Sequence, residues 1–219
     1  NPVPSFTAQT VIDNYMKAIG GKEALRRVKD MKMSMTASAE GQTIDMTIQR
    51  KVPNKLVITL GMSGFVMSQT KFDGEKGVVL DMSGEVQPMD EASLKTFKDQ
   101  AGIFEEIEYA TIGTRLQLKG VEKVEGRDAY KIEVTTPSGI KTTDFFDKAT
   151  WFKVRSVQIE QGEAGPVTSI TDYGDYRTVN GIKVPYRMKT SGATPIPLVF
   201  EGQLVEINKG IPDSEFYID

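Results

Sequence analysis

Histidine and cysteine are both missing from this chain of 219 residues. Zinc sites of the common kinds draw on Cys and His ligands, so a site of that kind is excluded within the chain. Histidine-based catalytic triads, cysteine proteases, disulfides and iron–sulfur ligation are excluded for the same reason. The chemistry that remains is that of carboxylates, lysine and tyrosine, and we expect no metal and no other cofactor.

Long apolar runs and a basic excess are also missing. No stretch approaches the roughly 20 apolar residues of a membrane-spanning helix, so we expect no transmembrane segment. The net charge is −3, whereas a nucleic-acid-binding protein usually concentrates a basic excess on one face. We therefore expect no nucleic-acid partner. Residues 1–6 have neither a basic region nor an apolar core, and they predict no signal peptide.

The composition is that of an ordinary globular protein, with 39% hydrophobic and 26% charged residues. Chains of this length commonly form one unit when they are rich in β-strands. We expect a single domain over residues 1–219, with residues 1–7 as a tether. Helices are expected over residues 8–29, because Thr7 is a suitable N-cap and Gly20-Gly21 a suitable stop. Between them apolar residues recur at helical spacing: Val11, Ile12, Tyr15, Met16 and Ile19.

After Asp30 the apolar residues alternate with polar ones at a period of two, which is typical of strands with one buried face. Turn signals follow at short intervals, among them Asn180-Gly181, which favours a type I′ hairpin, and a glycine-containing turn at 162–165. Strand and helix segments do not alternate regularly, so the sheet should be antiparallel and meandering. About a dozen strands are expected, at 31–37, 44–48, 56–62, 65–72, 77–82, 115–118, 130–134, 140–146, 152–159, 167–173, 182–188 and 198–207.

The first four strands carry an unusual number of methionines on one face. Methionine is unbranched and polarizable, so it suits surfaces that accept apolar groups of variable shape, although it also fills ordinary cores. The alternation predicts an inward face that includes Met33, Met35, Met46, Ile48, Ile58 and Leu60.

Residues 90–109 interrupt the strand pattern and are expected to form a helical insertion. Asp90 is a suitable N-cap, and Gly102 divides the insertion into two parts. Its apolar residues are too many to remain in water, so the insertion is expected to close over the concave face as a lid. The three acids Glu105, Glu106 and Glu108 are expected to face solvent at the rim.

Three short patterns could indicate catalysis. Ser138 and Lys141 match an S-x-x-K motif, but they fall at a hairpin tip, where residues three apart point to opposite faces of a strand. The pair Asp172 and Asp175 and the pair Glu105-Glu106 could act as paired carboxylates. Solvated or turn-forming roles are far more common for such acids, so we expect no enzyme.

Several segments together resemble a known family. They are 18–25 at the end of the first helix, 72–77 at a turn, 126–134 leading into Phe145-Phe146-Asp147, and 172–185 followed by 207–213. In these segments the chain resembles the LolA/LolB-like outer-membrane lipoprotein-sorting superfamily, in the form common in Bacteroidetes envelope proteins. Similar segments also occur attached to insulinase-type zinc peptidases, whose zinc motif requires histidine. The resemblance implies a mostly β (α+β) fold: a half-open curved antiparallel barrel of about eleven strands, with N-terminal helices and a helical lid over an apolar cavity.

These observations favour a periplasmic or envelope-associated, non-catalytic protein that binds an apolar ligand, such as a lipid or an acylated lipoprotein, with lipoprotein sorting or carriage as its expected role. The alternatives are an accessory or interaction domain of a longer envelope protein, such as an insulinase-type peptidase, and a carboxylate hydrolase. The residues expected to line the cavity are Met33, Met35, Met46, Ile48, Ile58, Leu60, Met62, Met67, Leu94, Phe97, Phe104 and Ile107.

Overall fold

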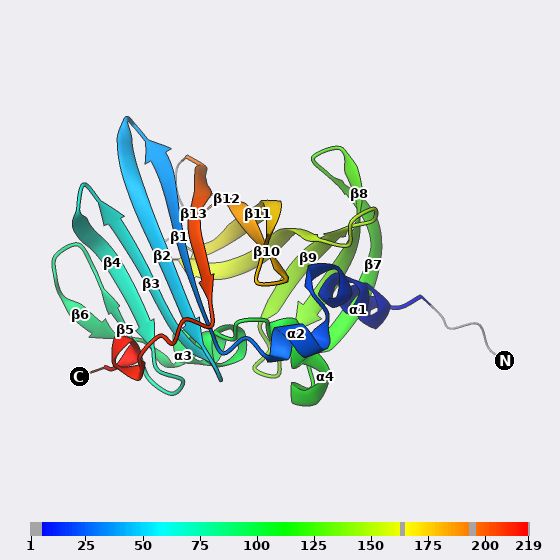
Figure 1. Cartoon of the computed structure of the whole chain (residues 1–219), viewed down its shortest axis with the longest axis horizontal. Helices are drawn as coiled ribbons and strands as arrows, with labels where there is room; N and C mark the ends of the chain where they lie inside the picture. The colour runs from blue at the N-terminus through cyan, green and yellow to red at the C-terminus, as the bar shows by residue number, and fades with distance from the viewer. Residues whose placement is uncertain (1–5, 163–164, 193–195, 219) are drawn as a thin grey trace.

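The computed structural model describes residues 6–162, 165–192 and 196–218, and it consists of one large sheet with short helices (Figure 1). Residues 1–5 of the expected tether and residues 163–164 of the expected 162–165 turn lie outside the described residues. The helical elements are α1 (Ala8–Ile19), α2 (Lys22–Arg26), α3 (Glu91–Gln100), α4 (Tyr109–Ile112) and the 3-10 helices η1 (Glu105–Ile107) and η2 (Asp213–Phe216). The strands are β1 (Asp30–Ala39), β2 (Gln42–Lys51), β3 (Lys55–Met62), β4 (Phe65–Phe72), β5 (Gly77–Leu80), β6 (Val86–Pro88), β7 (Arg115–Val124), β8 (Arg127–Thr135), β9 (Lys141–Asp147), β10 (Lys153–Gly162), β11 (Gly165–Val179), β12 (Ile182–Ser191) and β13 (Leu198–Ile207).

The sheet is antiparallel throughout and has the order β6-β5-β4-β3-β2-β1-β13-β12-β11-β10-β9-β8-β7. The expected fold class, a mostly β, half-open curved antiparallel sheet with N-terminal helices, is confirmed. The described residues form thirteen strands where about eleven were implied. Strand β6 was not expected, because three residues are too few to show a period-two pattern.

The sheet curves around helix α1. Helix α1 contacts both β7 and β12, although four strands lie between these two in the sheet order. Figure 1 shows β6 at one end of the sheet, β7 at the other, and α1, α2 and α3 along the lower side between them. Register shifts interrupt the β1–β13, β3–β4, β7–β8 and β9–β10 ladders, and such bulges increase local bend and twist.

Helix α1 forms where the sequence predicts it. The Thr7 side chain accepts a hydrogen bond from the Thr10 amide at 3.3 Å, and Gly20 ends the helix with a φ of 144°. One face of the helix is buried against the sheet, namely Ala8, Val11, Ile12, Tyr15, Met16 and Ile19.

The expected strand register is present on the concave face. Met33 pairs with Ile48 and Met35 with Met46 across β1 and β2, and these positions continue into β3. They belong to the same buried cluster as the apolar face of α1. The Asn180-Gly181 turn between β11 and β12 has φ values of 49° and 80°, as a type I′ hairpin requires. Among the described helices, none is long and apolar enough to cross a membrane.

Candidate ligand-binding site beneath the lid segment

Residues 90–109, called the lid segment below, leave the sheet between β6 and β7 and cover part of the concave face. The Asp90 carboxylate accepts a hydrogen bond from the Ser93 amide at 2.7 Å and starts α3 as expected. The Phe97 ring lies 5.7 Å from the Phe72 ring of β4, measured between centroids. The apolar side chains of the segment are half-buried against the core, namely Leu94, Phe97, Ile103, Phe104 and Ile107.

Arg50 of β2 binds the lid segment through hydrogen bonds at the end of α3. Its Nη1 donates hydrogen bonds to the carbonyl oxygens of Gln100 at 3.1 Å and Gly102 at 2.7 Å. Gln100 is the last residue of α3 and Gly102 follows the helix, so neither carbonyl has a partner within the helix and the guanidinium satisfies both. Burial lowers the pKa of Arg50, but an arginine remains charged at any physiological pH.

A second contact joins α3 to the β8–β9 hairpin. The Asp99 carboxylate accepts hydrogen bonds from the Ser138 amide at 3.2 Å and from the Ser138 hydroxyl. Lys141, the other half of the S-x-x-K pattern, is exposed. The serine that the motif singled out therefore contacts the lid segment through a carboxylate.

Lys153 of β10 is the centre of a buried charge cluster. Its ammonium lies 2.5 Å from Glu106 Oε1 of the lid segment and 3.3 Å from Asp144 Oδ2 of β9. Asp144 Oδ1 also accepts a hydrogen bond of 2.6 Å from the Ser156 hydroxyl. Burial alone would lower the pKa of Lys153, but the charges of Asp144 and Glu106 outweigh it and raise that pKa well above its usual value. The lysine is therefore a permanent cation between two carboxylates.

A bulge turns Lys153 inward. Lys153 pairs with Phe146 and Arg155 pairs with Phe145, so Val154 is an extra residue on β10. Ser156 lies on the concave face, and strict alternation from it would send Lys153 to the outside. The bulge reverses this, and Val154 packs in a small cluster with Phe145 instead.

Glu105 lies beside this cluster with its carboxyl at the cavity lining. Burial, and next the charge of Glu106, raise the pKa of Glu105 to about 8. The expectation that Glu105, Glu106 and Glu108 all face solvent is therefore wrong for two of them: Glu106 is 5% exposed and Glu105 is half-buried, while Glu108 is exposed. The reason is that η1 turns inward to meet Lys153, which faces the cavity because of the bulge at Val154.

A cavity of about 260 Å³ lies between α3 and the inner face of β9, β10 and β11. Most of its lining is polar, in contrast to the apolar lining that the sequence predicted. Among the described residues, Leu56 and Phe97 supply its apolar side chains. The polar ones are Arg50, Thr96, Gln100, Glu105, Thr142, Asp144, Lys153, Ser156, Gln158, Ser169, Thr171 and Tyr173.

A second cavity of about 170 Å³ adjoins the first and is more apolar. Four residues line both cavities, namely Arg50, Glu105, Lys153 and Tyr173. Beyond them the second cavity is bounded mainly by Tyr15, Met31, Met33, Ile48, Ile103, Phe104, Tyr176, Val184 and Met188. The two together form a site with a polar half and an apolar half.

Tyrosines at this boundary remain neutral. Burial raises the pKa of Tyr173 to about 12, and it also raises the pKa values of Tyr15 and Tyr176. The Tyr176 hydroxyl donates a hydrogen bond of 2.8 Å to the Lys153 carbonyl. With raised pKa values these phenols keep their protons at neutral pH.

The twelve residues expected to line a cavity fall into three groups. Four of them line one of the two cavities: Met33, Ile48, Phe97 and Phe104. Six pack in or against the adjoining core: Met35, Met46, Ile58, Leu60, Leu94 and Ile107. Met62 and Met67, both half-buried, lie outside the lining of either cavity, and Met67 falls at a bulge where alternation no longer fixes its direction. Their role in binding remains a prediction.

Of the two acid pairs considered for hydrolysis, Glu105 and Glu106 line the second cavity, whereas Asp172 and Asp175 lie apart from both cavities. Asp172 Oδ1 lies 2.5 Å from Arg155 Nε, and Asp175 Oδ2 lies 2.6 Å from Arg177 Nη2. Each aspartate thus has its own arginine partner, which is the ordinary role of such charges.

No protein-family model matches the sequence, and no curated protein sequence matches it either. Solved structures do resemble it. A LolA superfamily protein from Nitrosomonas europaea matches with a TM-score of 0.61 and 12% identity, covering 98% of this chain and 99% of the other. A DUF1329 family protein from Desulfovibrio piger ATCC 29098 matches with a TM-score of 0.62 and 12% identity, covering 97% and 98%.

A third structure, described as a putative outer membrane lipoprotein-sorting protein domain from Vibrio parahaemolyticus, has a TM-score of 0.58 and 11% identity over 95% of both chains. All three likenesses extend over nearly the whole of both molecules. The chain therefore shares its fold with these three structures, one of which is described as a LolA superfamily protein. The resemblance seen in the sequence motifs is confirmed at the level of the fold.

Proposed function

We propose that this protein binds a lipid-like ligand between the lid segment and the concave face of the sheet, without transforming it chemically. The observation that carries the proposal is the pair of adjoining cavities, one polar and one apolar, beneath a segment that is fastened through Arg50 and Lys153. An alkyl chain in the apolar half would gain about 0.8 kcal/mol for each buried methylene. Such binding needs no nucleophile and no metal.

The likeness in fold supports a role in the bacterial envelope. One similar structure is described as an outer membrane lipoprotein-sorting domain. We accordingly propose a periplasmic or envelope-associated setting and a lipid or an acylated lipoprotein as the partner, with lipoprotein sorting or carriage as the process. The methionines of β1 adapt to chains of different shape, which suits a carrier of varied lipids.

The charge cluster also supports binding over catalysis. Lys153 is held as a cation between Glu106 and Asp144, so it has no free electron pair with which to attack a substrate. Glu105 alone has a shifted pKa suited to proton transfer, but no nucleophile within the cavity lining is activated by hydrogen bonding to it.

The experiment that tests this proposal measures binding of a fluorescent fatty-acid analogue to the protein and to Phe104→Asp. Phe104 lines the apolar cavity and is half-buried, so an aspartate there would place a charge beside the alkyl chain. We expect saturable binding by the wild type and a loss of about tenfold or more in the variant, with a smaller effect on the thermal midpoint.

The matched control is Phe65→Asp, the same substitution at a side chain that is 78% exposed on the β3–β4 hairpin. It should bind like the wild type. Signal no larger than that of a non-binding protein would overturn the proposal and leave the accessory-domain alternative. A steep fall in the melting temperature of Phe104→Asp would show that Phe104 is fixed core packing.

A further inference from the structure

The polar half of the site, which is the first cavity, is lined by polar side chains on three neighbouring strands. These side chains are called the polar grid below. Thr142 and Asp144 of β9 stand opposite Gln158 and Ser156 of β10. Those two in turn stand opposite Ser169 and Thr171 of β11. All six line the same cavity, so hydroxyl, amide and carboxylate groups replace the apolar groups that face inward on β1, β2 and β3.

Most of this grid has unused hydrogen-bonding capacity. Within the part of the chain that the structure describes, five lining side chains make no hydrogen bond to another protein group: Thr142, Gln158, Ser169, Thr171 and Tyr173. Thr142 is only 8% exposed, and its side chain lines the cavity. Hydroxyl and amide groups that line a cavity without a protein partner can form hydrogen bonds with a molecule that enters it.

The charges at the cavity favour a neutral partner. The two cations, Arg50 and Lys153, already have carbonyl and carboxylate partners. An anionic head group would also meet the Asp144 carboxylate in the same lining. Glu105 holds its proton below a pH of about 8 and is then neutral. The positive charges of Arg50 and Lys153 are then balanced by the negative charges of Asp144 and Glu106.

We propose that the polar half of the site binds the neutral, hydroxyl-rich head group of an amphipathic ligand, and that the alkyl chain of this ligand lies in the apolar half. Such a head group is a sugar or a glycerol. The inference rests on the proposed function and specifies its ligand class. Hydroxyl groups both donate and accept, so they match threonine, serine and glutamine side chains equally well. The Phe97 and Tyr173 rings in the same lining offer flat surfaces for the apolar face of a sugar.

The experiment compares four ligands for their ability to displace a fluorescent apolar probe from the whole protein, below the critical micelle concentration of each detergent. Dodecyl maltoside, dodecylphosphocholine and laurate share one alkyl chain and differ in the head, and maltose is the head alone. We expect dodecyl maltoside to bind at least about tenfold more tightly than laurate, because its head adds several hydrogen bonds.

Two variants test the grid itself. Thr171→Val and Gln158→Leu each keep the side-chain size and remove hydrogen-bonding groups that face the cavity. Each should weaken dodecyl maltoside by about fivefold to tenfold and change laurate by less than about twofold. Thr168→Val is the matched control, because Thr168 is exposed on the same strand. Melting curves of all three confirm that the variants are folded.

The possible outcomes separate this inference from the proposed function. Laurate binding as tightly as dodecyl maltoside, or variants that leave the affinity for dodecyl maltoside unchanged, would overturn the neutral-head inference while the lipid-binding function stands. Displacement by none of the three dodecyl compounds would overturn both. Maltose binding as tightly as dodecyl maltoside would show that the alkyl half is unused and would overturn both as well.

Discussion

The Lys153 ammonium and the Glu106 carboxylate, 2.5 Å apart, connect strand β10 to the lid segment. Both side chains are largely buried, at 11% and 5% exposure. Removing one partner of such a pair leaves the other as an uncompensated buried charge. The contact therefore keeps the lid segment on the sheet.

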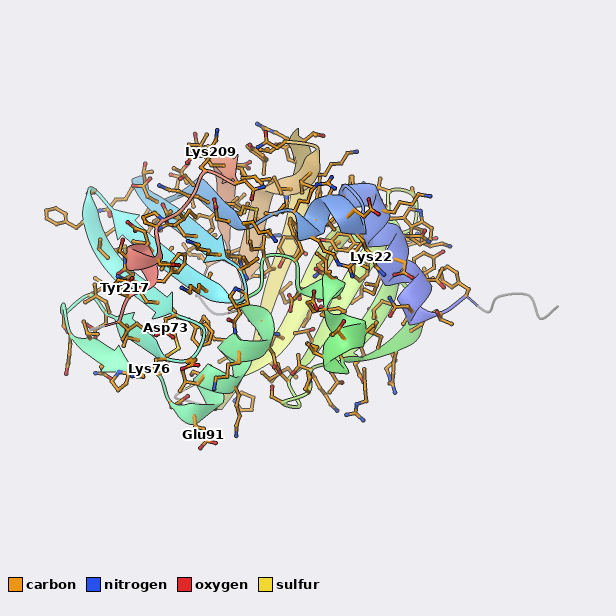
Figure 2. All side chains as sticks on the ribbon, turned by 60° about the horizontal axis from the view of Figure 1, so that its bottom comes forward. Lys22, Asp73, Lys76, Glu91, Lys209 and Tyr217 are labelled. Carbon is orange, nitrogen blue, oxygen red and sulfur yellow. The ribbon has the colours of Figure 1, made fainter. Side chains whose placement is uncertain are left out.

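We expect Lys153→Met to destabilise the protein by about 3–5 kcal/mol, because Glu106 and Asp144 would lose their shared cation. Urea unfolding followed by circular dichroism measures the free energy of unfolding. The control is Lys209→Met at an exposed site, which Figure 2 shows at the edge of the molecule and which should change stability by less than about 0.5 kcal/mol. A loss for Lys153→Met no larger than that of the control would contradict the role of the cluster.

The raised pKa of Glu105 predicts a pH-dependent stability. Between its ordinary value of 4.5 and about 8, the folded state retains a proton that the unfolded state releases, so stability falls as the pH rises through this window and levels off above it. The slope from this one group is at most about 1.4 kcal/mol per pH unit. We expect Glu105→Gln, which cannot ionise, to flatten the dependence.

The measurement is the free energy of unfolding of the wild type and Glu105→Gln at several pH values from about 5 to 9. The difference between the two proteins isolates Glu105 from every other titrating group. An equal pH dependence in both would show that Glu105 titrates normally in the folded protein. Glu108→Gln, at an exposed acid of the same segment, serves as the control and should follow the wild type.

Arg50→Met should loosen the lid segment without unfolding the sheet. The variant keeps most of the aliphatic side chain but frees the Gln100 and Gly102 carbonyls. We expect faster amide hydrogen exchange across residues 94–107, with unchanged protection in the central strands β1 and β13. Arg26→Met, at an exposed arginine of α2, should leave exchange unchanged in both regions. Uniform loss of protection in Arg50→Met would show that Arg50 supports the whole fold and not the lid segment.

Much of the fold could be predicted from the sequence because its signals are local. The alternation in β1 and β2, the Thr7 cap and the Asn180-Gly181 turn each depend on neighbouring residues, and each is present in the structure. The position of the lid segment followed from the loss of the strand pattern at Asp90. That the whole chain forms a single domain remains a prediction, which limited proteolysis near residue 120 would test.

The polar half of the site could not be predicted, because it depends on contacts between distant segments. Lys153 faces inward only because of the bulge at Val154, and Glu106 is buried only because Lys153 is there. A run of inward-facing Thr, Ser and Gln on three consecutive strands was visible in the sequence. Its alternation with apolar residues such as Val157 and Ile159 resembles a strand whose polar face lies in water, and only the curvature of the sheet encloses it.

The most direct test of ligand binding beneath the lid segment is photo-crosslinking with an alkyl maltoside that carries a diazirine at the end of its chain, followed by mass spectrometry of the labelled peptides. The account predicts labelling at residues that line the apolar cavity, such as Met33, Ile48 and Phe104, and loss of this labelling with an excess of unlabelled dodecyl maltoside. Labelling confined to exposed apolar residues such as Ile159 and Leu204, or labelling that the competitor does not reduce, would contradict it.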